Sequence, residues 1–78
     1  MARYYFDLQD NDGITPDDEG LELRNLALVQ DEAARSLADM ARDAVRTNAS
    51  NQRMAIQVRD DKGPVMNVRF SFEIERIN

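Results

Sequence analysis

Apolar side chains stand at every second position in the C-terminal third of the chain, with the period of two that is typical of β-strands. The alternation runs through residues 54–59 and resumes over residues 66–75. The sequence Asp60-Asp61-Lys62-Gly63 lies between them and has the composition of a tight turn. The pattern therefore predicts a β-hairpin, and the length and hydrophobicity of its second strand predict that this strand is central in the sheet.

A second group of strand signals lies near the N-terminus. Residues 3–8 are rich in aromatic side chains, and their even-numbered members are apolar, so we expect a strand with one buried face. Asp10-Asn11-Asp12-Gly13 follows as a turn. Beyond it, residues 14–15 and 21–23 are the apolar ends of an acidic stretch, and they favour a short second strand.

The middle of the chain has the three- and four-residue spacing of an amphipathic helix over about residues 26–47. Asn25 is placed to cap its first turn. Alanine-rich stretches keep the helix slim enough to approach a sheet closely. The predicted buried stripe consists of Leu26, Val29, Ala33, Leu37, Met40 and Ala44.

Together these elements predict an α+β fold of two layers, in which one helix packs on a small antiparallel sheet. The predicted order is strand, short strand, helix, strand, strand. The first strand should pair antiparallel with the last, whose hairpin partner lies on its other side. The opposite face of the sheet should be open. With 78 residues, the chain is short enough to form a single domain over residues 1–78.

The amino-acid composition excludes several kinds of binding site and catalysis. The chain contains no cysteine and no histidine, which excludes disulfides, thiolate metal sites and histidine-based catalysis. No stretch reaches the roughly 18 to 20 apolar residues of a membrane span, and the N-terminus lacks the layout of a signal peptide. We therefore expect a cytoplasmic, non-catalytic protein that has no cofactor and does not bind membranes.

The formal charge of −5 is concentrated in one region, because residues 1–24 carry two bases against seven acids. Carboxylates are the ligands that Ca²⁺ and Mg²⁺ prefer, so a divalent-cation site is one hypothesis. The competing interpretation is a solvated, turn-rich acidic loop, and the spacing does not fit an EF-hand. The candidate ligands are Asp10, Asp12, Asp17, Asp18 and Glu19.

Three segments resemble one known family. They are Arg3-Tyr4-Tyr5-Phe6-Asp7, the stretch Pro16-Asp17-Asp18-Glu19-Gly20-Leu21-Glu22-Leu23, and Val58-Arg59-Asp60-Asp61-Lys62-Gly63-Pro64-Val65. With the alanine-rich helix, they resemble a group of short alphaproteobacterial proteins, common in rhizobia, that form a domain-of-unknown-function family. Arg24-Asn25 departs from the Pro-Asp expected before the helix. The resemblance implies a bacterial protein and implies no activity, ligand or catalytic residue.

A binding or assembly role remains as the main hypothesis. A small sheet with exposed edges gains stability by pairing with another chain, so we expect a homodimer, through a strand edge or the open sheet face, or a complex with an unidentified protein. Weak nucleic-acid binding on the open face is a further alternative, which the acidic segment and the single exposed aromatic disfavour. The candidate partner-binding residues are Tyr5, Asp17, Asp18, Glu19, Glu22, Arg59 and Arg69.

Overall fold

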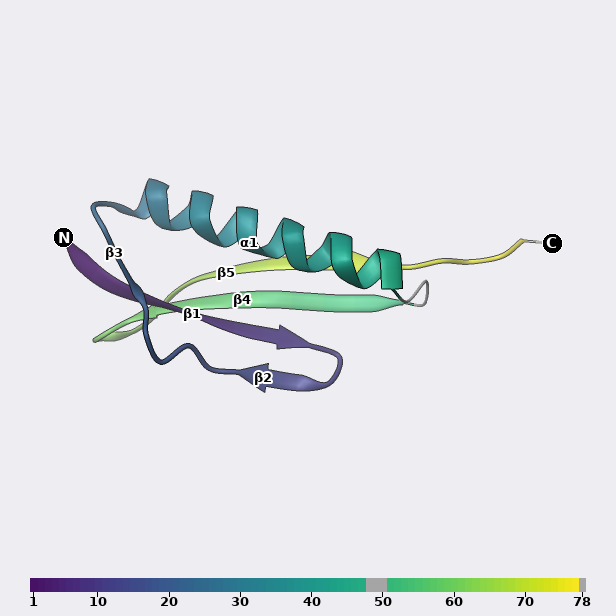
Figure 1. Cartoon of the computed structure of the whole chain (residues 1–78), viewed down its shortest axis with the longest axis horizontal. Helices are drawn as coiled ribbons and strands as arrows, with labels where there is room; N and C mark the ends of the chain where they lie inside the picture. Colours follow the sequence, from purple (N-terminus) through teal and green to yellow (C-terminus); the bar gives the residue numbers. More distant parts are fainter. Residues whose placement is uncertain (48–50, 78) are drawn as a thin grey trace.

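The computed structural model describes residues 1–47 and 51–77 of the chain. One helix lies across one face of an antiparallel sheet, so the predicted α+β fold of two layers is confirmed (Figure 1). The elements, in chain order, are β1 (Ala2–Asp10), β2 (Gly13–Thr15), β3 (Leu21–Leu23), α1 (Leu26–Thr47), β4 (Gln52–Asp60) and β5 (Gly63–Phe72).

The order of the strands differs from the prediction. The sheet runs β2-β1-β4-β5, with β3 paired to the other half of β1. Our prediction that the last strand is central is therefore wrong: β4 is central, and β5 is an edge strand. The predicted pairing of the first strand with the last is wrong as well, because β1 pairs with β4. Pro64, near the start of β5, offers the physical reason, because proline has no N–H to donate and is confined to edges and strand starts.

The predicted short second strand is two separate strands on the same edge of β1. Leu8 of β1 lies opposite Thr15 of β2, and Tyr4 of β1 lies opposite Leu21 of β3. Residues 16–20 connect the two short strands. They pass opposite the centre of β1 without pairing as a strand, which makes this edge of the sheet irregular.

The core lies between α1 and the face of the sheet formed by β1 and β4. Ile56 and Val58 of the central strand are fully buried, at 0% exposure. The even-numbered apolar side chains of the edge strand β5 from Met66 to Phe72 are only half-buried, because a single neighbouring strand covers them. The buried core residues are Tyr4, Phe6, Val29, Ala33, Leu37, Ala41, Met54, Ile56 and Val58.

The helix begins where the sequence predicts. The side-chain Oδ1 of Asn25 accepts a hydrogen bond of 2.9 Å from the N–H of Leu28, and this satisfies a backbone donor of the first turn. Leu26, which we predicted in the buried stripe, is 52% exposed. Leu26 is the first residue of α1, and burial of the stripe begins at Val29.

Candidate functional site

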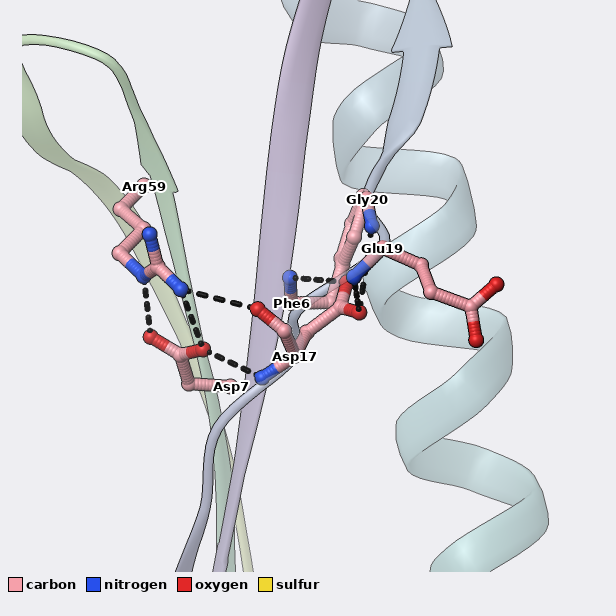
Figure 2. A network of polar contacts seen from close by, with 6 residues as sticks. All are labelled: Phe6, Asp7, Asp17, Glu19, Gly20 and Arg59. Carbon is pink, nitrogen blue, oxygen red and sulfur yellow. Dashed lines mark hydrogen bonds and ion pairs between the residues drawn. The ribbon is translucent and has the colours of Figure 1, made fainter.

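Asp17 holds the connection between β2 and β3 against the sheet. β1 pairs with β2 and β3 only near its two ends, so its centre faces residues 16–20. At this point Oδ2 of Asp17 accepts a hydrogen bond of 3.1 Å from the Phe6 N–H. Oδ1 of Asp17 accepts two more, at 3.0 Å from the Glu19 N–H and 3.2 Å from the Gly20 N–H. The Asp17 carboxylate thus has two functions: it accepts the hydrogen bond that a neighbouring strand would accept from the centre of β1, and it closes the turn at residues 17–20 (Figure 2).

Asp7 and Arg59 extend this network to the central strand. Nε of Arg59 donates to Oδ2 of Asp7 at 2.8 Å, and its Nη2 donates to the Asp17 carbonyl oxygen at 2.9 Å. Oδ1 of Asp7 accepts a hydrogen bond of 2.9 Å from the Asp17 N–H. The Arg59 guanidinium also lies 4.5 Å from the centre of the Tyr5 ring, in a cation–π contact. We call Asp7, Asp17 and Arg59 the polar clamp (Figure 2).

The contacts within the clamp change the pKa values of all three side chains. Burial raises the pKa of the Asp7 carboxyl, but the hydrogen bonds from Arg59 and from the Asp17 N–H outweigh burial, so the pKa lies below the usual 3.8. Burial likewise raises the pKa of Asp17, and the three backbone N–H donors more than reverse it. The hydrogen bond to Asp7 raises the pKa of Arg59. All three groups are therefore charged at neutral pH.

The oxygens of both carboxylates already accept hydrogen bonds from donors within the chain. Each carboxylate oxygen of Asp7 and of Asp17 accepts at least one hydrogen bond from a backbone N–H or from Arg59. A general acid at neutral pH needs a raised pKa, and these two pKa values are lowered. The arrangement suits a structural clamp that binds residues 16–20 to β1 and β4.

The five candidate metal ligands are divided between two loops. Oδ1 of Asp10 accepts hydrogen bonds from the N–H groups of Asp12 and Gly13 and so closes the β1–β2 turn. Asp17 belongs to the clamp, whereas Asp18 and Glu19 are exposed, and the Glu19 side chain points away from it (Figure 2). Within residues 1–47 and 51–77, no three acidic side chains form a group that could hold a metal ion.

The candidate partner-binding residues also lie at different places in the structure. Tyr5 and Arg59 contact each other at the clamp. Glu22 forms an exposed ion pair of 3.3 Å with Arg3. Arg69 lies apart from the clamp, on the edge strand β5. The structure therefore brings together Tyr5, Asp17 and Arg59, and it engages them in contacts within the chain.

A groove between α1 and β5 is the feature that the sequence analysis missed. It has a volume of about 660 Å³ and is open to solvent. Exposed alanines of α1 form one wall, and the half-buried Phe70 of β5 contributes to the other. Ala34, Ala38 and Val45 each follow a residue of the predicted buried stripe directly in the sequence. They form a second row of apolar side chains next to the stripe, and this row could have revealed the groove. The lining residues are Ala34, Leu37, Ala38, Ala41, Arg42, Val45, Arg46, Arg69 and Phe70.

In a comparison with protein-family models, residues 3–71 match a domain of unknown function, DUF6894. The chain therefore belongs to this family, and the expectation of a domain-of-unknown-function family is confirmed at that level. The alphaproteobacterial origin stays a prediction. Searches of the curated proteins and of the solved structures found no match. In the part of the chain that the structure describes, no helix is long and apolar enough to cross a membrane.

Proposed function

We propose that this member of the DUF6894 family is a non-catalytic assembly module that binds another polypeptide chain. The binding region is the β5 surface, by which we mean the unpaired edge of β5 together with the adjoining groove along α1. One observation carries the proposal: an open apolar groove of about 660 Å³ adjoins a ten-residue strand that, within residues 1–47 and 51–77, has a neighbouring strand on one side only. An unpaired strand edge is a feature through which proteins associate, and concave sites lined mainly by apolar side chains are where ligands bind.

The dimensions of the chain support association. A compact monomer of 8.9 kDa is expected to expose about 4,800 Å² and to have a radius of gyration of about 11.5 Å. The chain exposes 5951 Å², and its radius of gyration is 14.0 Å, with extents of 52 × 22 × 17 Å. The surplus surface is shared between the elongated two-layer body and residues 73–77, which are exposed and extend beyond the sheet (Figure 1). Covering part of that surface with a partner would give the protomer the burial of an ordinary small domain.

Photo-crosslinking tests the proposal. A photoreactive benzoylphenylalanine is introduced at Ala38, which lines the groove, or at the neighbouring Asp39, which is exposed on α1 and does not line it. The variants are expressed in cells of the source organism and irradiated. We expect a discrete protein adduct from position 38 and at most a weak one from position 39. No adduct from position 38, or equal yields from both positions, would overturn the proposal.

A further inference from the structure

We infer that the partner of the β5 surface is a second copy of this chain, which pairs through β5 across a twofold axis. This inference rests on the proposed function and names its partner. The two sheets would join into one antiparallel sheet in the order β2-β1-β4-β5-β5-β4-β1-β2. Such an interface is isologous and closed, so it produces a dimer rather than a filament.

The two edges of the sheet differ in how open they are to pairing. β2 and β3 are three residues each, and residues 16–20 between them carry a proline and three acids. Short strands, proline and charge all obstruct edge pairing. β5 has ten residues, its proline lies near its start, and from Val65 to Phe72 its one charged side chain is Arg69. The pairing of β4 with β5 skips Val65, and this bulge together with Pro64 obstructs pairing at the start of β5. The β2–β3 edge is thus protected along its length, whereas the β5 edge is open from Met66 to Phe72.

The alternation of β5 selects the register of the pairing. Residues that lie opposite each other in antiparallel strands point to the same face, so the half-buried even-numbered residues must face even-numbered partners. A twofold axis at Arg69 would set two like charges opposite each other, which is unfavourable. An axis at Val68 sets Arg69 opposite Asn67 of the second copy, whose carbonyl can accept a guanidinium hydrogen bond. It also sets Phe70 opposite Met66 and covers both apolar side chains.

The surface area of the chain is sufficient for such an interface. A specific interface buries about 800 Å² per partner. The chain exposes 5951 Å², about 1,100 Å² more than a compact monomer of its mass. In the dimer each groove gains the edge of the second copy as a further wall. Part of this surplus belongs to residues 73–77, which extend beyond the sheet (Figure 1), so the surplus is an upper limit on the area that the β5 surface can bury in a dimer.

Cysteine crosslinking tests the register, because the chain contains no cysteine of its own. A Val68→Cys variant brings two thiols face to face across the axis, at the Cα separation of about 5 Å that a disulfide requires. A Ser71→Cys variant, on the same strand, faces Val65 of the second copy and is the matched control. Under mild oxidation we expect a covalent dimer from the first variant and little from the second. Equal yields, or a higher yield from Asn67→Cys, would overturn this pairing.

Light scattering with charge variants gives an independent test on an exposed side chain. Asn67→Glu creates two symmetric pairs with Arg69 and should tighten the dimer about 2- to 30-fold, whereas Asn67→Arg should weaken it by a similar factor. Gln9→Glu and Gln9→Arg change the same net charge on the same face, but on β1, two strands away from β5, and should leave the dissociation constant within about twofold.

The outcomes separate the two proposals. A wild-type chain that has the monomer mass up to millimolar concentration overturns the homodimer. The same result accompanied by an adduct between position 38 and a different protein leaves the assembly function standing. A monomer without any position-38 adduct overturns both.

Discussion

Removal of the Asp17 carboxylate should destabilise the fold, and removal of the adjacent Asp18 carboxylate should not. The two residues are neighbours of identical chemistry within the acidic segment. Asp17 accepts hydrogen bonds from the backbone N–H groups of Phe6, Glu19 and Gly20. Asp18 is exposed, and no side-chain hydrogen bond or ion pair of Asp18 occurs in the described part of the chain. Asp17→Ala and Asp18→Ala therefore form a matched pair.

The expected magnitude follows from the three donors that lose their acceptor. The Phe6 N–H is part-buried, and leaving such a donor without a partner costs about 1–3 kcal/mol. The donors at Glu19 and Gly20 can turn to water, so each adds at most about 1 kcal/mol. We expect a loss of about 2–4 kcal/mol for Asp17→Ala, out of the roughly 4–12 kcal/mol expected for a domain of this length. For Asp18→Ala we expect a change within about 0.5 kcal/mol.

Urea unfolding at one fixed protein concentration measures the difference. With a slope of about 1 kcal/mol per molar, the Asp17→Ala midpoint should fall by about 2 M or more, and the Asp18→Ala midpoint should stay near that of the wild type. Asp17→Asn keeps one acceptor oxygen and should lie between them. Equal midpoints for Asp17→Ala and Asp18→Ala would refute the clamp as a stabilising element. An Asp18→Ala loss as large as that expected for Asp17→Ala would do the same.

The sequence predicted the elements well because each depends on local information. Asn25 is followed by an amphipathic stretch, and the turn at residues 60–63 lies between two alternating segments, so the helix, the C-terminal hairpin and the two layers could be inferred. The strands β2 and β3 were expected as one short strand, because the local pattern does not show that they pair with different halves of β1. The position of β4 could not be inferred, because an alternating pattern does not reveal whether a strand has one neighbour or two. Pro64 was the one available signal. The role of Asp17 also stayed hidden, because it depends on the connection lying opposite Phe6, a contact between distant segments.

Three further predictions concern the acids of the clamp, Gly20 and the helix cap Asn25. Because the pKa values of Asp7 and Asp17 are lowered in the folded chain, the unfolded chain binds more protons below about pH 4, and the free energy of unfolding should decrease as the pH is lowered there. In a pH series of urea midpoints, Asp7→Asn should depend less on pH than the wild type; an equally steep series would contradict this. Gly20→Ala should cost about 2 kcal/mol or more, because φ is +74° and a Cβ would lie 2.9 Å from the Tyr4 carbonyl oxygen; an unchanged melting temperature would exclude it. Asn25→Ala should cost about 1 kcal/mol and Asn25→Asp almost nothing, by urea midpoints, and equal losses would argue against the cap.

The polar clamp also bears on where function should be sought. Each of the three segments that carry the family resemblance supplies one member of the clamp: Asp7, Asp17 and Arg59. These residues hydrogen-bond one another, so each of the three segments contributes a residue that stabilises the fold. The described contacts of the clamp use neither residues 66–72 of β5 nor the groove along α1. Variants of the clamp should therefore be read as stability variants, and variants of the β5 surface as tests of binding.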